Sequence, residues 1–347
     1  MKHFIFFIAV IFLGLFLAVL NKNEQSTITS TVPTLRVFGY ASFTGRWGPG
    51  PLLKEQFEKT CKCKVEFIEG SDSGILLQRL KIEGESLGAD LVIGLDQFDL
   101  SKAMAEQTWR KLSLGELNVY DSVKPALSNG SFIPYDWGAL TFVARKNELT
   151  NYPDTLDELL APELNKKIAL EDPRTSSPGM QFLYWVLKSK GEEEGFKFLD
   201  KIMAQAHSFS PTWSTAYGLF TSKQAKLAYS YVTSPLYHEL EEKRQDYTAL
   251  PFAEPLPVQF EFVGIPEFCR HCELAEKFIN LMLSNEGQKT IMEKNYMFPV
   301  MKGIMEGTPF ANALVHVKTM DQFEVPSVTE VERILKRWTE IRRGALN

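Results

Sequence analysis

Aromatic and carboxylate side chains follow several of the strands that the sequence predicts. Tyr40, Asp72 and Asp96 each stand just after a predicted strand, where the crossover loops of a parallel sheet converge. We therefore expect them to face one cleft, together with Trp47 in the Gly/Pro-rich connection GYASFTGRWGPGP. Asp96 has a second interpretation, because it also suits the cap of a helix that starts at Gln97.

Further candidates for this cleft are aromatic or acidic. They are Asp136, Trp137, Trp213, Tyr231 and Tyr296. Aromatic faces beside carboxylates suit a flat organic cation, since a desolvated cation–π contact contributes up to about 2 kcal/mol. Core packing is the alternative role of each aromatic. Trp213 and Tyr217 are four residues apart, and of the two Trp213 is the better ligand candidate because it precedes a predicted helix.

A Ser/Thr-rich turn supplies a different kind of donor. In EDPRTSSPGMQF, Thr175, Ser176 and Ser177 precede Pro178, which suits the first turn of a helix. Free amides and hydroxyls at a helix start favour an anion. An ordinary helix cap explains the same residues equally well.

Catalytic motifs are missing from the chain. It contains no HExxH, no GxxxxGK[ST] and no GxGxxG after a strand. The segment GSDSG resembles a nucleophile elbow only superficially, because its central residue is Asp72. The five histidines are scattered, without an evident base for a Ser or Cys nucleophile. These features favour a binding protein over an enzyme, with no metal and no cofactor.

The periodicity predicts a mixed α/β fold. Strands are expected at 34–40, 64–69 and 89–95, with helices at 49–60 and 75–85 between them. This βαβαβ order predicts a parallel, doubly wound sheet. Strands and helices keep alternating afterwards, and the tail from Cys272 is mostly helical. No single break divides the composition, so we expect two lobes between which the chain crosses more than once.

The N-terminus and the charge indicate an exported protein. Residues 1–33 combine a Lys2-containing start, a 17-residue apolar run from Phe4 to Leu20 and a polar stretch, which is typical of a signal peptide. A retained N-terminal anchor is the alternative. The segment carries a net +1, from two lysines and one glutamate, so the formal charge of −5 becomes −6 for the exported part. Such an acidic chain is a poor partner for nucleic acid.

Four cysteines form two local pairs. Cys61 and Cys63 are separated by one residue, and Cys269 and Cys272 by two. In an oxidising compartment such pairs more often form disulfides than bind metal, although spacing alone leaves three pairings open. A redox pair and a zinc site that uses His271 are the alternatives.

These residues lie in segments that strongly resemble the periplasmic thiamine-binding proteins of ABC uptake systems. The matching segments run in order from about Leu35 to Val300: GYASF…WGPGP, CKC, LLQRLKIEG…ADLVIGLD, F.P.DWG, EDPRTSSPG, WSTAYGLF, SYVTSPLYHELEEK and NYMFPV. The chain departs from the family pattern at Ala41, where an Asp is usual, and at Trp137, Val232 and Tyr296. The second cysteine pair and the last 40 or so residues are not part of that pattern.

The resemblance implies a site and a function. Ligand contacts are expected from the following residues: Tyr40, Trp47, Asp72, Ser73, Ser177, Pro178, Trp213, Tyr231, Val232, Thr233, Ser234 and Tyr296. Thiamine, thiamine monophosphate or thiamine diphosphate would be captured and passed to an ABC permease in the inner membrane by a periplasmic monomer. Ser177 and Pro178 are implied at the phosphate or hydroxyethyl end.

The implied fold is a two-lobed, type II solute-binding protein. We predict one lobe from residues 34–134 plus 258–347 and the other from 135–257, each a mostly parallel sheet flanked by helices. Two alternative functions are left open. The first is a binding protein for another small cation, which would be a polyamine or, with Tyr229 and Tyr231 as ligands, ferric iron. The second is an exported thiamine-processing enzyme.

Overall fold

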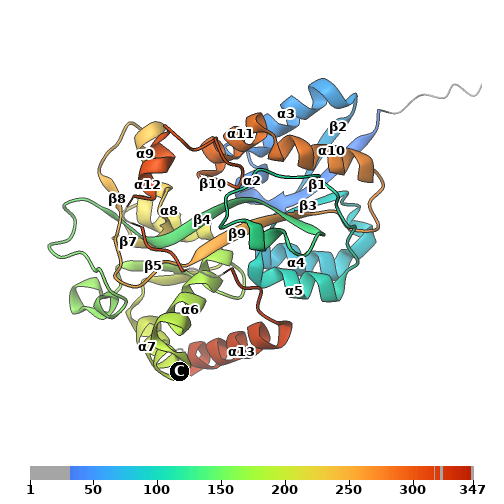
Figure 1. Ribbon diagram of the computed structural model, residues 1–347. Helices are drawn as coiled ribbons and strands as arrows, with labels where there is room; N and C mark the ends of the chain where they lie inside the picture. The colour runs from blue at the N-terminus through green and yellow to red at the C-terminus, as the bar shows by residue number, and fades with distance from the viewer. Residues whose placement is uncertain (1–31, 316, 321–322, 345–347) are drawn as a thin grey trace, which may run out of the picture. The chain divides into compact units, whose positions relative to one another are not determined.

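The computed structural model describes residues 32–315, 317–320 and 323–344. Its strands are β1 (Thr34–Tyr40), β2 (Lys64–Gly70), β3 (Leu91–Asp96), β4 (Phe132–Arg145), β5 (Ile168–Glu171), β6 (Ser208–Ser210), β7 (Leu227–Tyr231), β8 (Tyr247–Ala249), β9 (Val258–Gly264) and β10 (Phe298–Pro299). Its α-helices are α2 (Ala41–Thr44), α3 (Gly50–Cys61), α4 (Ser73–Glu83), α5 (Gln97–Glu106), α6 (Ser177–Lys190), α7 (Glu192–Gln205), α8 (Trp213–Thr221), α9 (Ser234–Leu240), α10 (Cys272–Leu283), α11 (Asn285–Asn295), α12 (Pro309–Ala313) and α13 (Val328–Gly344). Short 3₁₀ helices lie between several of them. Figure 1 shows how the labelled strands and helices are arranged.

The predicted βαβαβ unit is confirmed. β1 pairs in parallel with β2 on one side and with β3 on the other. The apolar runs 34–40 and 89–95 and the prolines near the start of α3 identified these elements correctly, with boundaries within two residues. Asp96 caps α5 by accepting hydrogen bonds from the amides of Phe98 and Asp99, so its alternative interpretation as a cap is confirmed.

Two long antiparallel strands connect the parallel parts of the sheet. The strand order is β2-β1-β3-β9-β4-β7-β5-β6, with β8 and β10 also pairing with β4. β9 lies between β3 and β4, and it pairs with β4 from Phe132 to Ala139. The remainder of β4 pairs with β7, which is parallel to β5. β4 therefore runs from one parallel region into the other.

The buried apolar side chains form two large clusters. The first contains Leu35, Val37 and Phe38 of β1 with Phe278 and Ile279 of α10. Figure 1 shows α3, α10 and α11 together near the β1 and β2 end of the sheet. The second cluster gathers around β4, β7, α6 and α7, with Phe142, Trp185 and Tyr229 at its centre. The lobe boundaries themselves stay a prediction.

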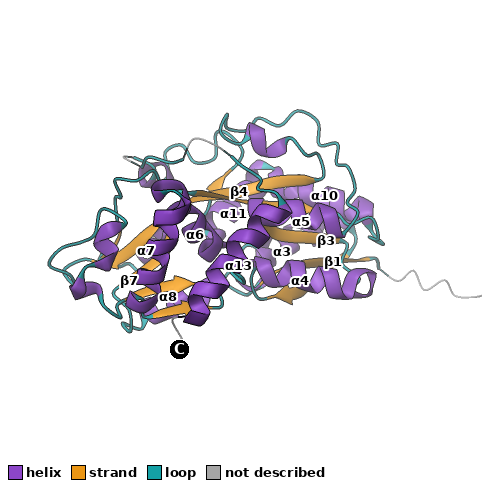
Figure 2. Cartoon of the chain, turned by 90° about the horizontal axis from the view of Figure 1, so that it is seen from below, coloured by secondary structure: helices purple, strands orange, loops and turns teal. Residues whose placement is uncertain are grey.

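The C-terminal helix α13 contacts both α5 and α7 (Figure 2). Its Ile334 and Trp338 are buried in the second cluster, where the Trp338 ring lies 5.0 Å from that of Phe209. Arg333 and Arg337 on the same helix pair with Glu192 and Glu193 at the start of α7. The predicted helical tail is thus a packed part of the fold.

Each cysteine pair forms a local disulfide. Cys61 is bonded to Cys63, and Cys269 to Cys272. The disulfide interpretation is therefore correct and resolves the three pairings that spacing left open. Cys61 is the last residue of α3, and Cys272 is the first residue of α10, so each disulfide ties a helix end to the adjoining loop.

The predicted export signal, residues 1–33, lies outside the described residues except for its last two positions. Within the described part of the chain, no helix has both the length and the apolar character needed to cross a membrane.

We predict that Trp338→Ala lowers the free energy of unfolding by about 3–5 kcal/mol, because it removes a fully buried indole from the second cluster. Urea denaturation followed by circular dichroism measures the change. Lys336→Ala on the exposed face of α13 is the matched control, expected within about 0.5 kcal/mol of the native protein. Equal stability of the two variants would contradict the assigned packing of α13.

Candidate functional site

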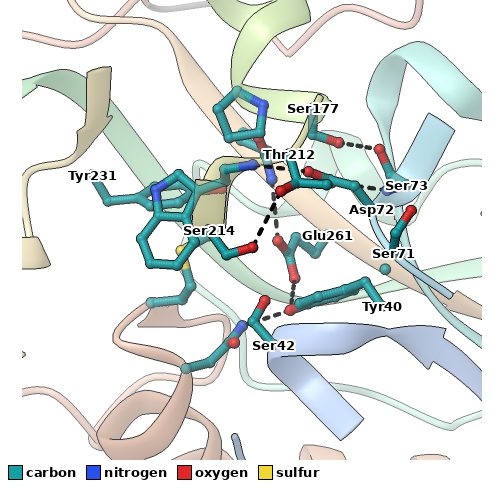
Figure 3. A pocket seen from close by; sticks show the side chains of 16 residues that line it. Tyr40, Ser42, Ser71, Asp72, Ser73, Ser177, Thr212, Ser214, Tyr231 and Glu261 are labelled. Carbon is teal, nitrogen blue, oxygen red and sulfur yellow. Dashed lines mark hydrogen bonds between the residues drawn. The ribbon is translucent and has the colours of Figure 1, made fainter. Parts of the chain in front are cut away.

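A pocket opens where several strands and helices end (Figure 3). It is lined by Tyr40, Ser42, Ser71, Asp72, Ser73, Gly94, Ser177, Pro178, Thr212, Trp213, Ser214, Tyr231, Gln259, Glu261, Asn295 and Met297. Tyr40 ends β1, Asp72 follows β2 and Tyr231 ends β7. The pocket thus lies at the carboxyl ends of parallel strands, where crossover loops place ligand sites in open α/β sheets.

Tyr40 is held by a close approach to β3. Gly94 has φ +101°, and a Cβ at this position would lie 2.1 Å from Cδ1 of Tyr40. Only glycine therefore leaves room for the ring and tolerates this backbone conformation. The Tyr40 hydroxyl donates a hydrogen bond of 2.5 Å to Glu261. The ring is fixed in the wall of the pocket as a result.

Asp72 caps α4 and also reaches the start of α8. Its carboxylate accepts hydrogen bonds from the amides of Ser73, at 2.8 Å, and of Trp213, at 3.3 Å. Burial raises the pKa of Asp72, while these amides act in the opposite direction. The carboxylate thus occupies amides at two helix N-termini, which would otherwise attract an anion.

Ser73 and Ser177 join the starts of α4 and α6. Their hydroxyls hydrogen-bond each other, and both side chains are buried (Figure 3). Pro178 stands in the first turn of α6, as its position in the sequence predicts. Hydroxyls of Ser71, Thr212 and Ser214 line the same region. This side of the pocket can donate to, or accept from, a hydroxyl or an oxyanion.

Trp213 and Tyr231 provide aromatic surface. The Trp213 ring stacks on Tyr217 at 5.1 Å, and its indole N–H donates to Ser230 Oγ at 2.9 Å. Tyr231 lies against Gly138 of β4, where a Cβ would come within 2.6 Å of its Cδ1. Both rings are held by neighbours that leave them in contact with the pocket.

Glu261, Tyr135, Gln259 and Asn295 were not among the site residues predicted from the sequence. Glu261 accepts hydrogen bonds from the hydroxyls of Tyr40 and Tyr135 and from the side-chain amide of Gln259. Asn295 donates to Tyr40 and to Asp136. The available signal was QFEF in β9, which places Gln259 and Glu261 two residues apart on one side of an otherwise apolar strand.

Five predicted site residues lie outside the pocket lining. Trp47 is 74% exposed, with the guanidinium of Arg46 over its ring. Val232 is buried in the second cluster, and Thr233 donates to the backbone carbonyl of Tyr296.

Ser234 hydrogen-bonds Ser230 at 2.7 Å. The Tyr296 hydroxyl donates to Glu241, and its ring contacts Tyr237. Their role in ligand binding remains a prediction.

The other candidates for the cleft have structural partners. Asp96 caps α5, and Trp137 packs between Phe260 and Phe298. Asp136 is fully buried one residue before Trp137. Thr175 donates to the carbonyl of Pro211, which connects the turn before α6 to the loop before α8.

The pocket lining has an acidic charge balance. Asp72 and Glu261 line it, whereas Lys, Arg and His do not occur among the lining residues. Within the described ranges, no group of three or more His, Cys, Asp or Glu side chains is arranged to hold a metal ion. The pocket therefore combines carboxylates, aromatic faces and hydroxyls.

The sequence matches one family model and is similar to several periplasmic binding proteins. Residues 89–321 match the model of the family described as bacterial extracellular solute-binding protein. A thiamine-binding periplasmic protein of Brucella suis is 38% identical over 269 residues, which cover 78% of this chain and 80% of that relative. A protein of the same description from Escherichia coli is 37% identical over 268 residues, covering 77% of this chain and 81% of the relative.

A solved structure is similar to the chain over most of its length. The structure described as a periplasmic thiamin binding protein superposes with a TM-score of 0.80 at 33% sequence identity, covering 90% of this chain and 96% of that one. This similarity confirms the predicted class of a two-lobed, type II solute-binding fold. The chain belongs to the bacterial extracellular solute-binding proteins.

Proposed function

We propose that the protein captures thiamine, thiamine monophosphate and thiamine diphosphate in the periplasm and delivers them to an ABC permease. Relatives at 37–38% identity and a structure at 33% identity carry thiamine-binding descriptions. The protein works as a monomer in this account, and its mechanism is capture, closure and docking without bond-making.

The observation that carries the proposal is the charge of the pocket. Asp72 and Glu261 line it together with the rings of Tyr40, Trp213 and Tyr231, and no basic side chain belongs to the lining. The thiazolium ring of thiamine has a permanent positive charge and a flat apolar face. Carboxylates attract the charge, and aromatic faces favour the ring through cation–π contacts.

The hydroxyl-rich side suits the other end of the ligand. Ser73 and Ser177 stand at the starts of α4 and α6, beside Thr212 and Ser214 near the start of α8. These groups can hydrogen-bond the hydroxyethyl group or a phosphate. Asp72 lies among them, so its negative charge opposes a phosphate more than a hydroxyl. We infer that unphosphorylated thiamine binds most tightly.

We further propose that the lobes are residues 34–134 plus 258–347 and residues 135–257, and that they close around the ligand. Tyr40, Asp72 and Glu261 of the pocket belong to the first set, and Ser177, Trp213 and Tyr231 to the second. β4 and β9 connect the two sets and are the natural hinge. Contacts from both lobes would stabilise the closed state.

The alternative ligands have less support. Ferric iron prefers a set of hard oxygen and nitrogen donors, whereas the Tyr229 ring packs between Phe142 and Phe182 in the second cluster. A polyamine needs several carboxylates spaced along a groove and makes no use of the hydroxyl-rich side. A thiamine-processing enzyme needs a nucleophile, and the four cysteines are paired in disulfides.

We predict that thiamine binds to the purified protein in a one-to-one ratio with submicromolar Kd and quenches tryptophan fluorescence. Trp213→Ala should weaken binding about 10- to 100-fold, equivalent to ~1.4–2.8 kcal/mol, because it removes an aromatic wall of the pocket. Isothermal calorimetry measures both affinities. Trp213→Phe, which keeps an aromatic face, is the matched control and should retain most of the affinity. Native protein that binds spermidine or Fe(III) but none of the thiamine forms would reject the proposal.

Asp72→Asn should change the preference between thiamine and its phosphates. The substitution keeps a helix-capping side chain but removes a negative charge, so we expect the ratio of monophosphate to thiamine affinity to rise roughly tenfold. Competition calorimetry on both ligands gives this ratio. Asp154→Asn, in an exposed loop outside the pocket lining, should leave this ratio unchanged. An unaltered ratio in Asp72→Asn would show that the phosphate binds away from this carboxylate.

A further inference from the structure

Two buried carboxylates face each other across the hinge strands. Asp136 of β4 and Glu261 of β9 are direct partners in the antiparallel register. Asp136 is 0% exposed and Glu261 is 7% exposed. Side chains directly opposite in such a pair have Cβ atoms about 4.5–5.5 Å apart, and like charges there are destabilising. The pair therefore favours a state in which one carboxyl group holds a proton.

Hydrogen bonds distinguish the two members of the pair. Glu261 accepts from the hydroxyls of Tyr40, at 2.5 Å, and Tyr135, at 2.6 Å, and from the amide of Gln259, at 3.1 Å. Asp136 accepts from Asn295 through Oδ2 at 2.7 Å, and its Oδ1 is buried without a hydrogen-bond partner. Three donors stabilise a charged Glu261, so the proton belongs on Asp136.

The pKa shifts agree with this division. Burial and the charge of Glu261 raise the pKa of Asp136 well above its usual range. Burial also raises the pKa of Glu261, but the hydroxyls of Tyr135 and Tyr40 oppose that rise.

The groups that face the pair are acidic or neutral. Asp72 at the start of α4 and Asp96 at the end of β3 act on Glu261 through their charges. Burial raises the pKa of Asp96 to about 6. Burial and the charges of Glu261 and Asp136 raise the pKa of Tyr231 of β7 well above its usual value. Lys294, which precedes Asn295 on α11, forms its ion pair with Glu241 instead. No lysine, arginine or histidine of the pocket lining balances the charge.

We propose that Glu261 is the counter-ion of the bound cation, and that cation binding displaces a proton from the Asp136–Glu261 pair and its acidic neighbours to solvent. This inference rests on the proposed function, because it takes the thiazolium ring as the cation. Glu261 then determines specificity for charged over neutral ligands, and Asp136 is a positioning residue that stores the proton while the pocket is empty.

The direction of the pH effect follows from charge. A cation beside the carboxylates stabilises their ionised forms and lowers their pKa values in the complex. Protons are released where the pH lies between the pKa values of the empty and the occupied protein. Affinity therefore rises with pH through that window, by up to tenfold per pH unit for one proton, and becomes constant above it.

Calorimetry on the native protein tests the inference without any substitution. Thiamine is titrated between pH 5.5 and 8 in pairs of buffers with different heats of ionisation, and the dependence of the observed heat on the buffer gives the number of protons released. We expect up to about one proton per thiamine, with Kd decreasing as pH rises. Tight binding with no proton release and a constant Kd would overturn the inference and leave the proposed function intact. Absence of thiamine binding at every pH would overturn both.

Two variants assign the roles. Asp136→Asn should keep thiamine binding but reduce proton release and flatten the pH dependence. Glu261→Gln should weaken binding at least tenfold at pH 7.5. Glu66→Gln, on an exposed position of β2 outside the pocket lining, is the control and should match the native protein. Thermal unfolding verifies that each variant is folded. A folded Asp136→Asn variant that releases as many protons as the native protein would contradict the role of Asp136. A folded Glu261→Gln variant that binds thiamine as tightly as the native protein would contradict the role of Glu261.

Discussion

The site depends on one constraint: its pocket is lined by carboxylates but by no basic side chain that would balance their charge. Burying a carboxylate costs free energy unless hydrogen bonds or an opposite charge compensate it. Here the compensation comes from neutral donors: amides at the starts of α4 and α8 for Asp72, and tyrosine hydroxyls for Glu261. These donors hold the carboxylates in place but leave their charge available. A cation that enters the pocket completes the balance.

The fold provides these donors through its topology. Parallel strands end on the same side, so the helices that follow begin there and direct their N–H groups toward the pocket. β9 runs antiparallel between β3 and β4 and inserts Glu261 beside Tyr40. The same two strands, β4 and β9, connect the predicted lobes. A change of charge at Asp136 and Glu261 therefore occurs in the segment about which the lobes are proposed to move.

Local sequence patterns predicted much of this arrangement. The strand and helix periodicity predicted β1, α3, β2, α4 and β3 but not the short helix α2, and the position at or just after the end of a strand identified Tyr40 and Asp72 as pocket residues. The same rule was less informative for Asp96, where helix capping decides the role of the side chain. Trp47 stands on the predicted connection, but its ring is directed to solvent in this structure, because a loop position does not fix the direction of a side chain.

The acidic pair could not be predicted from local pattern. Asp136 and Glu261 are 125 positions apart, and their contact depends on the register between β4 and β9, which strand propensity does not specify. Both also stand inside strands, where alternation alone does not distinguish a buried polar group from an exposed one. Gln259 and Glu261 are visible in the sequence as polar residues of β9. Their hydrogen-bond partners are known only once the strands are paired in the fold.

A crystal structure of the native protein with thiamine tests the central claim most directly. The account predicts that the thiazolium ring lies between the aromatic walls formed by Trp213 and Tyr231, with its charged nitrogen within about 4–5 Å of the Glu261 carboxylate. The hydroxyethyl group is expected beside Ser73 and Ser177. A thiazolium ring bound outside this pocket, or with a basic side chain between it and Glu261, would contradict the account.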